Sequence, residues 1–499
     1  MGLRWSYTVV LVVAGLVVGG GYGFPAEDLV NSLPGQPNVT FRQYAGYVDV
    51  DGKNGRSLFY YFVEADENPD EKPLTLWFNG GHYQIFSLSS LRLGSDGHIR
   101  TKTRIIIPAM KIQARDMYKF LLIWYNKFRA FRTRELFLAG ESYAGHYIPQ
   151  LAILLLNHNA HSPDPFNLQG IALGNPLLKV NPDVPAVYEY LWSHGLISDE
   201  IKLAITKECD FDYYSFAGTN NATQYPCLDA LDEAFKIVGD YADFYGVIYD
   251  VCYPSIVEQQ LRLRKMATKM SLGVDVCKME ETAFYLNLHE VQKALHANRT
   301  NLPYNWSDCS GIIDYRLSDG DIDMIPLLRT ILKKDIRVFI YSGDQDSVVP
   351  LLGTRTIVRE LAHDLKFNIS VPYGAWFHKG QCRSGRTTSR MCNVNFGPLT
   401  ALLFVGITDT GRRLANRIWE VVDFHNSCRT ICDIFSNKLD TYNFGPVGGW
   451  QTEYGKLLTF ITVKGAAHMV PYSQPSKALH FFTSFVRGRT LPNTTRIPI

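Results

Sequence analysis

Three residues of this sequence have the side chains that together carry out acyl transfer: Ser142, Asp346 and His468. In such a set the histidine takes the serine proton, and the aspartate holds the imidazole in one tautomer and stabilises the imidazolium that forms. The serine oxygen then attacks a carbonyl carbon, and a covalent acyl-enzyme results. This chemistry needs neither a metal nor an organic cofactor.

The strongest local signal surrounds Ser142. Residues 136–139 are an apolar run typical of a buried strand, a turn of small residues follows, and residues 146–156 have the spacing of a helix. A strand, a sharp turn with a central serine and a helix together raise the hydroxyl above the sheet. Gly140 and Ala144 are small where a strained turn leaves little room, although Ala144 replaces the glycine of the usual pattern.

Asp346 and His468 follow two further strand-like runs, 337–343 and 456–463. Nucleophile, acid and base in this chain order, each at the carboxyl end of a strand, is the arrangement of α/β hydrolases. Asp346 is the better acid because it lies on the loop that leaves the strand. Asp344 is interpreted as a turn or capping residue.

Four motifs in this sequence resemble those of the plant serine carboxypeptidase-like family. They are Gly-Glu-Ser-Tyr-Ala-Gly-His-Tyr-Ile-Pro-Gln-Leu-Ala at 140–152, Leu-Trp-Phe-Asn-Gly-Gly at 76–81, Ser-Gly-Asp-Gln-Asp-Ser-Val-Val-Pro at 342–350 and Gly-Ala-Ala-His-Met-Val-Pro at 465–471. The resemblance implies an α/β-hydrolase fold, with a mostly parallel central sheet flanked by helices and a helical cap insertion. It also implies a serine-type carboxypeptidase that acts on the C-termini of peptides and proteins without a cofactor.

The resemblance assigns roles to residues beside the nucleophile. The N–H groups of Gly81 and Tyr143 would form the oxyanion hole, since a glycine pair at a strand end lets backbone donors approach a substrate oxygen. Asn79 and Glu141 would hold the terminal carboxylate of the substrate. Two carboxyl groups share a hydrogen bond only when one is protonated, so Glu141 predicts an acidic pH optimum. From the residues alone, the Asn-Gly pair is also typical of a β-hairpin turn.

Length, composition and the first residues indicate a secreted globular enzyme. The 499 residues, 46% of them hydrophobic, suffice for a large core, and a net charge of +2 without a basic run argues against a nucleic-acid partner. Residues 1–23 have the pattern of a signal peptide, which predicts the secretory pathway, an extracellular or vacuolar location and no membrane anchor after cleavage. Six glycosylation sequons agree with this route: Asn38, Asn221, Asn298, Asn305, Asn368 and Asn493.

The predicted domain organisation is a catalytic core with an insertion. Residues 24–182 and 301–499 form the core, and residues 183–300 form a largely helical cap over the active site. A basic segment at 261–265 lies in this cap. It is either a site of cleavage into two chains, as in some relatives, or an exposed loop.

The nine cysteines are an odd number, which in a secreted chain calls for an explanation. Metal-type spacing is nearly absent, so a zinc site is not expected. The family resemblance pairs Cys209 with Cys227 and Cys252 with Cys277. Cys309 is then left over, because the family sequence that usually holds its partner is missing here.

Two windows depart from the family pattern. Residues 82–114 stand where the family has a cysteine, a central strand and part of the substrate pocket, and a sheet without that strand has unpaired backbone groups. Residues 104–107 are a candidate replacement strand. Residues 382–446 separate two segments that nearly adjoin in the family. The abrupt edges of both windows favour a gene-model error over a long functional loop.

The main interpretation is a serine carboxypeptidase that forms an acyl-enzyme on Ser142. An acyltransferase with the same triad is the alternative within the family, although Glu141 and Ala144 favour the peptidase. A catalytically impaired product or binding pseudoenzyme is the third interpretation, supported by the missing segment after Gly81. A homodimer is compatible with each of them.

Overall fold

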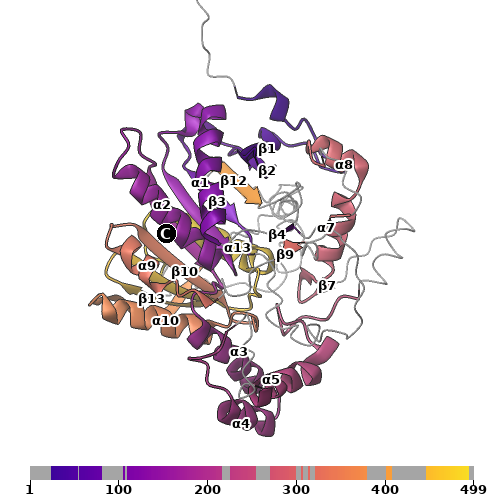
Figure 1. Cartoon of the computed structure of the whole chain (residues 1–499), viewed down its shortest axis with the longest axis vertical. Coiled ribbons are helices and arrows are strands. Elements are labelled where there is room, and N and C mark those ends of the chain that lie inside the picture. Colours follow the sequence, from indigo (N-terminus) through magenta and orange to yellow (C-terminus); the bar gives the residue numbers. More distant parts are fainter. Residues whose placement is uncertain are drawn as a thin grey trace, which may run out of the picture.

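The computed structural model describes residues 24–53, 55–80, 105–106, 110–215, 225–253, 270–298, 305–306, 313–314, 321–378, 401–406 and 446–493. A ten-stranded sheet runs through the molecule, with helices on both faces (Figure 1). In sheet order its strands are β1 (Gln43–Asp51), β2 (Arg56–Val63), β12 (Ala401–Gly406), β3 (Leu74–Phe78), β5 (Leu136–Glu141), β6 (Leu168–Gly174), β10 (Arg337–Gly343), β14 (Leu458–Val463), β13 (Val447–Tyr454) and β11 (Ile369–Phe377).

The centre of this sheet is parallel and its margins are antiparallel. Neighbouring strands from β3 to β14 pair in parallel, whereas β1 pairs with β2 and β13 with both β14 and β11 in antiparallel fashion. Parallel strands are buried on both faces and therefore appear in a sequence as unbroken apolar runs. All six residues of β5 are buried. The expected α/β architecture with a mostly parallel sheet is confirmed.

One central strand comes from an unexpected part of the chain. β12 lies between β2 and β3, antiparallel to the former and parallel to the latter, and it belongs to the window at 382–446. The expectation that two strands lose their ladder partner is therefore wrong. So is the candidate replacement at 104–107, since β4 (Ile105–Ile106) pairs with β9 (Ile313–Asp314) in a separate sheet. Two residues are too few to cover β3, which has five.

The described helices either pack on the two faces of the sheet or lie beyond it (Figure 1). They are α1 (Met110–Lys127), α2 (Ala144–Asn159), α3 (Val180–Ser193), α4 (Asp199–Glu208), α5 (Tyr225–Val238), α7 (Lys278–Leu286), α8 (His289–Ala294), α9 (Ile325–Leu332), α10 (Leu351–Asp364), α12 (Val470–Ser473) and α13 (Pro475–Val486). Short 3-10 helices are η1 (Ala26–Asp28), η2 (Pro69–Glu71), η4 (Arg129–Phe131) and η6 (Gly239–Tyr241). None of the helices within the described part of the chain is long and apolar enough to cross a membrane.

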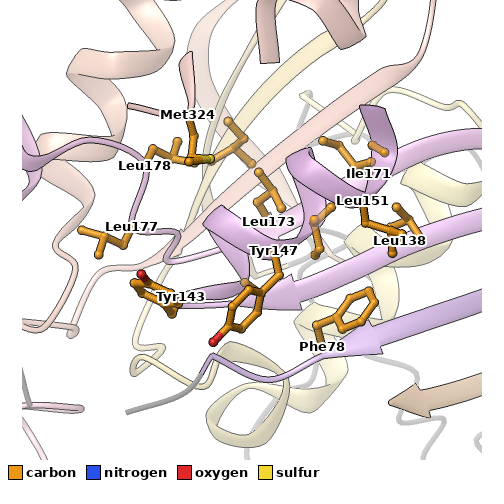
Figure 2. Packing of buried hydrophobic residues seen from close by; sticks show 14 of the residues in the cluster. Phe78, Leu138, Tyr143, Tyr147, Leu151, Ile171, Leu173, Leu177, Leu178 and Met324 are labelled. Carbon is orange, nitrogen blue, oxygen red and sulfur yellow. The ribbon is translucent and has the colours of Figure 1, made fainter. Parts of the chain in front are cut away.

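The alternation of side chains along β5 divides the core. Leu138 points to the larger cluster, which α1, α2, α9 and α10 share with the sheet, and Figure 2 shows it beside Leu151 of α2 and Ile171 of β6. Phe137 points the other way and packs with Phe485 of α13. Because the period of a strand is two, β5 fills both cores and is held rigidly between them.

Between β6 and α9, the described residues form α3, α4, α5, α7 and α8 and carry two disulfides. Cys209–Cys227 joins the end of α4 to α5, and Cys252–Cys277 closes a second loop. Both pairs are those that the family resemblance implies. α4 and α5 lie together at one end of the molecule, in the lower part of Figure 1. The limits of a cap domain at 183–300 stay a prediction.

Several predicted features lie outside the described residues: the signal peptide at 1–23, Gly81, the basic segment at 261–265, and the residues Asn221 and Cys309. The asparagines of the other five sequons are described. Asn298 is half-buried, and the remaining four have exposed side chains: Asn38, Asn305, Asn368 and Asn493.

Candidate active site

The turn between β5 and α2 holds Ser142 in a strained backbone conformation. Its φ is +60°, in the left-handed region that residues other than glycine rarely adopt. The turn is nevertheless fixed, because the Ser142 N–H donates to the carbonyl of Gly174 at 2.8 Å. A side chain on Gly140 would collide with the carbonyl of Phe78, which explains the small residue there. This is the geometry of a nucleophile elbow.

The Asn-Gly turn after β3 lies against the same elbow. A Cβ on Gly80 would collide with the Cβ of Ser142. β3 has parallel neighbours on both sides, so the hairpin interpretation of this turn is wrong. Phe78 is paired with Gly140, which brings Asn79 level with Glu141 on the neighbouring strand.

Asn79 and Glu141 differ in their surroundings. The Oδ1 atom of Asn79 accepts a hydrogen bond from Trp77 Nε1 at 2.9 Å, so its amide nitrogen is the end that can donate to a ligand. The Asn79 side chain is half-buried, whereas Glu141 is only 3% exposed.

Asp346 and His468 form a buried hydrogen-bonded pair. The distance from His468 Nδ1 to Asp346 Oδ2 is 2.8 Å, and neither residue is more than 3% exposed. The carboxylate also accepts hydrogen bonds from the N–H groups of Val348 and Val349 and from Asn175 Nδ2. These donors satisfy both oxygens of the buried carboxylate and fix its orientation. Because Nδ1 faces Asp346, Nε2 is the nitrogen for proton exchange.

Asp344 has a different task from Asp346. Its Oδ1 atom accepts a hydrogen bond from the Gly465 N–H at 2.6 Å, and the N–H of Gln345 donates to the carbonyl of Ala466 at 2.9 Å. Burial raises the pKa of Asp344, and its hydrogen bonds partly offset that rise. The residue joins the loop that carries Asp346 to the loop that carries His468, consistent with the turn role that the sequence indicates.

A segment outside the sheet joins these two loops as well. It comprises residues 243–249, after η6, and we call it the clamp segment. The carbonyl of Tyr245 accepts a hydrogen bond from the His468 N–H at 2.7 Å, and the Tyr245 ring lies edge-on to the imidazole with centroids 5.3 Å apart. Further bonds in the clamp are Ser347 N to Phe244 O at 3.1 Å, Val247 N to Gln345 O at 3.1 Å and Tyr249 Oη to Gly465 O at 3.0 Å.

Two other histidines have structural roles. His146 is fully buried in α2, its ring stacks on Tyr143 with centroids 4.7 Å apart, and burial lowers the pKa of His146 to about 3. His296 makes a hydrogen bond through Nδ1 with the carbonyl of Ala45 at 3.0 Å. Within the described ranges, no group of three or more histidine, cysteine or acidic residues could hold a metal ion.

Comparison with known proteins agrees with this geometry. A model of the family described as serine carboxypeptidase matches residues 34–82, 99–413 and 428–488. Serine carboxypeptidase-like 42 from Arabidopsis thaliana is 49% identical over 508 residues, which cover 95% of this chain and 93% of that protein. Serine carboxypeptidase-like 44 from the same plant is 46% identical over 507 residues, with coverages of 94% and 92%. The chain belongs to the serine carboxypeptidase family.

The solved structure of another carboxypeptidase has the same fold as this chain. It is the crystal structure of Kex1Δp, a prohormone-processing carboxypeptidase from Saccharomyces cerevisiae, with a TM-score of 0.59 and 16% identity over 93% of this chain and 96% of that one. The match confirms the α/β-hydrolase fold that the motifs imply.

The family match also bears on the two divergent windows of this carboxypeptidase sequence. It leaves out residues 83–98 and 414–427, which lie inside those windows. It continues through 99–114 and 382–413, so the family relationship extends into both. β12 falls in the matched part of the second window.

The structure brings most of the predicted site residues to one edge of the sheet. Ser142, Asp346 and His468 follow β5, β10 and β14, and Asn79 and Glu141 lie beside the serine turn. Two parts of the site were not among the predicted residues: Asn175 and the clamp segment. Asn175 follows β6, the strand between those of the serine and the aspartate, and a polar residue at that position is the signal that could have found it.

Proposed function

We propose that this protein removes C-terminal residues from peptides and proteins through an acyl-enzyme on Ser142. The observation that carries the proposal is the buried Asp346–His468 hydrogen bond at the same sheet edge as a strained serine turn. Membership of the serine carboxypeptidase family supports the substrate class.

The reaction follows from the roles of the three side chains. His468 Nε2 takes the hydroxyl proton while Ser142 Oγ attacks the carbonyl carbon of the last peptide bond. The tetrahedral intermediate collapses with cleavage of the C–N bond, and the imidazolium gives its proton to the leaving amine. Water then attacks the acyl-enzyme with the same proton transfers, which releases the shortened peptide and restores the serine. Asp346 stabilises the imidazolium in both halves of the reaction.

The neighbouring turns would bind two groups of the substrate, the oxyanion of the tetrahedral intermediate and the terminal carboxylate. The N–H groups of Tyr143 and Gly81 would stabilise the oxyanion. Asn79 and Glu141 would bind the terminal carboxylate, Asn79 through the amide nitrogen that Trp77 leaves as a donor. Glu141 must share a proton with that carboxylate, so activity should be highest at acidic pH. A rate that stays constant from about pH 4 to about pH 8 would contradict this assignment.

The cellular setting is proposed from the sequence. A signal peptide at 1–23 and the exposed sequons favour passage through the secretory pathway to the vacuole or the extracellular space. The substrates are peptide and protein C-termini. A homodimer stays a prediction.

Release of C-terminal residues by the purified chain tests the proposal. A peptide with a free C-terminus should lose residues one at a time, as mass spectrometry would show, whereas the same peptide amidated at its C-terminus should react far more slowly. Ser142→Ala should lower kcat by at least about 10⁴-fold. Equal cleavage of the free and amidated peptides would contradict a carboxypeptidase, and faster transfer of the acyl group to an added alcohol than to water would indicate the acyltransferase.

A further inference from the structure

We infer that Asn175 is a positioning residue that holds the Asp346 carboxylate against His468 and ties this pair to the Ser142 turn. The inference rests on the proposed function. Strands β5, β6, β10 and β14 are consecutive in the sheet, and in the same order they lead into Ser142, Asn175, Asp346 and His468. Asn175 occupies the place between nucleophile and acid.

The backbone of Asn175 is fixed in an unusual conformation. Its φ is +39°, and the residue is fully buried. Its N–H donates to the carbonyl of Tyr341 in β10 at 2.8 Å. Asparagine tolerates the left-handed region better than most residues, but a buried, hydrogen-bonded residue in that region needs a reason to be there.

The side chain supplies that reason, because both ends of the amide are used. Oδ1 accepts from the Gly343 N–H at 3.0 Å, and Nδ2 donates to Asp346 Oδ2 at 2.6 Å and towards the Val349 carbonyl at 3.4 Å. The two contacts on opposite ends fix the orientation of the amide, since the reverse orientation would set donor against donor. Hydrogen bonds to an ionised acceptor are stronger than those between neutral groups.

The same loop also contacts the nucleophile. The N–H of Ser142 donates to the Gly174 carbonyl at 2.8 Å, and the Ser142 carbonyl accepts from the Leu177 N–H at 3.1 Å. Residues 174–177 therefore bind the serine turn through their backbone and the aspartate through the side chain of Asn175. A change in this loop alters the placement of Asp346 relative to Ser142.

Loss of the Nδ2 donor would act on the charge of the pair as well as on its geometry. The carboxylate would lose one stabilising hydrogen bond, so the pair of Asp346 and His468 would bind a proton more readily and activity would be lost at higher pH. The other titratable groups that face the pair include Asp243 and Tyr245 of the clamp segment and Tyr190 of α3.

The test compares Asn175→Gly and Asn175→Asp with Asn68→Gly. Glycine accepts the left-handed backbone, so Asn175→Gly removes the side chain with little strain. Asn175→Asp keeps almost the same shape but replaces the donor with a second carboxyl group next to Asp346. Asn68 is a matched control, since it too is left-handed, with φ +48°, but it is exposed in the loop before β3.

In Asn175→Gly we expect kcat to fall about ten- to hundredfold, with KM changed less than about threefold, and the acid limb of the pH–rate profile to move up by about one pH unit. Asn175→Asp should lose at least as much activity despite its shape, whereas Asn68→Gly should match the wild type. A space-filling role for Asn175 predicts the opposite order, with Asn175→Asp active. That order, or a folded Asn175→Gly variant with an unmoved acid limb, would overturn the inference.

Proton NMR separates this inference from the proposed function. The Nδ1–H proton of His468 in its bond to Asp346 should give a downfield resonance that is observable without turnover. We expect that signal in the wild type and in Asn68→Gly, and a shifted or broadened signal in both Asn175 variants. An inactive wild type would contradict the proposed function alone, whereas an unchanged resonance in Asn175→Gly would contradict the positioning role alone.

Discussion

The two sides of the site are built in different ways. The acid–base side, with Asp346 and His468, is held by side-chain and backbone hydrogen bonds from loops that follow adjacent strands. The substrate side contains Asn79 and Gly80, which directly follow β3. The place of β3 in the sheet depends on its neighbour β12, which comes from a distant part of the chain. Both sides meet at the Ser142 turn.

Because of this difference, substitutions on the two sides should affect different properties, catalysis on one side and stability on the other. Substitutions on the acid–base side remove single hydrogen bonds at a buried charge, so they should change catalysis more than stability. The substrate side rests on a backbone ladder, and loss of a central strand leaves N–H and C=O groups of two neighbours unpaired. Changes there should act on stability first and on activity through it.

The largest expected effect is that of Asp346→Asn. The amide that replaces the carboxylate favours the wrong imidazole tautomer, so kcat should fall about 10⁴-fold while the chain stays folded. Steady-state kinetics with a peptide substrate measure this loss. Asp344→Asn is the matched control: it keeps an acceptor for the Gly465 N–H, and kcat should fall less than about tenfold. A greater loss of kcat in Asp344→Asn than in Asp346→Asn would show that Asp344, not Asp346, is the acid of the triad.

On the substrate side, Leu403→Pro should lower the free energy of unfolding by about 3 kcal/mol or more, because proline cannot donate to the ladder of a central strand. Leu403 lies in β12, opposite Phe62 of β2 and Leu76 of β3. Leu403→Ile keeps both the N–H and the volume of the side chain and should change the unfolding free energy by less than about 1.5 kcal/mol. Denaturant titration measures both. Equal stability of the proline variant and the wild type would show that β12 is not a strand of this sheet.

A pH-dependent effect on stability is expected beside the acid–base side, in the loop after β6. Asp183 binds the N–H groups of Leu178 and Lys179 in the loop after β6, and burial raises the pKa of Asp183 to about 7. The folded state then holds a proton that the unfolded state has lost, so stability falls as pH rises from about 4 to about 7, by up to about 1.4 kcal/mol per pH unit. Asp183→Asn should lack this loss.

Unfolding free energies measured across that pH range would test the prediction. Asp183→Asn should gain stability over the wild type as the pH rises, whereas Asn substitution of the exposed Asp240 should give a curve parallel to that of the wild type. Parallel curves for Asp183→Asn as well would show that this carboxyl group does not take up a proton on folding.

The smallest expected effect is at the clamp segment. Tyr249→Phe removes the hydroxyl that donates to the Gly465 carbonyl and should cost about 1 kcal/mol of unfolding free energy, with kcat/KM reduced less than about tenfold. Tyr241→Phe is the control, because Tyr241 is 89% exposed. Thermal unfolding and peptide kinetics would measure both variants. Equal stability and activity of the Tyr249→Phe and Tyr241→Phe variants would show that the Tyr249 hydrogen bond does not stabilise the site.

The parts of this architecture that could be predicted are local. The apolar runs before Ser142, Asp346 and His468 predict buried parallel strands because such strands have two buried faces. The small residues Gly140 and Ala144 indicate the strained serine turn, which has no room for larger side chains. Chain order then places all three side chains at the same sheet edge.

The parts that could not be predicted depend on distant partners. β12 has the composition of many apolar segments, and nothing within 401–406 indicates that its partners are β2 and β3. Asn175 precedes a proline after a strand, which is typical of an ordinary turn, and its contact with Asp346 appears only once β6 and β10 are neighbours. Most hydrogen bonds of the clamp segment use its backbone atoms, whose partners no residue type reveals.

Labelling of Ser142 by a fluorophosphonate is the most direct test of the central claim, because only a serine with a competent base beside it reacts quickly. Peptide mapping of the purified full chain should find one label, on Ser142, and Ser142→Ala should abolish both the label and the release of C-terminal residues. A chain that unfolds cooperatively, and is therefore folded, but takes up no label would show that the triad residues do not form a working site.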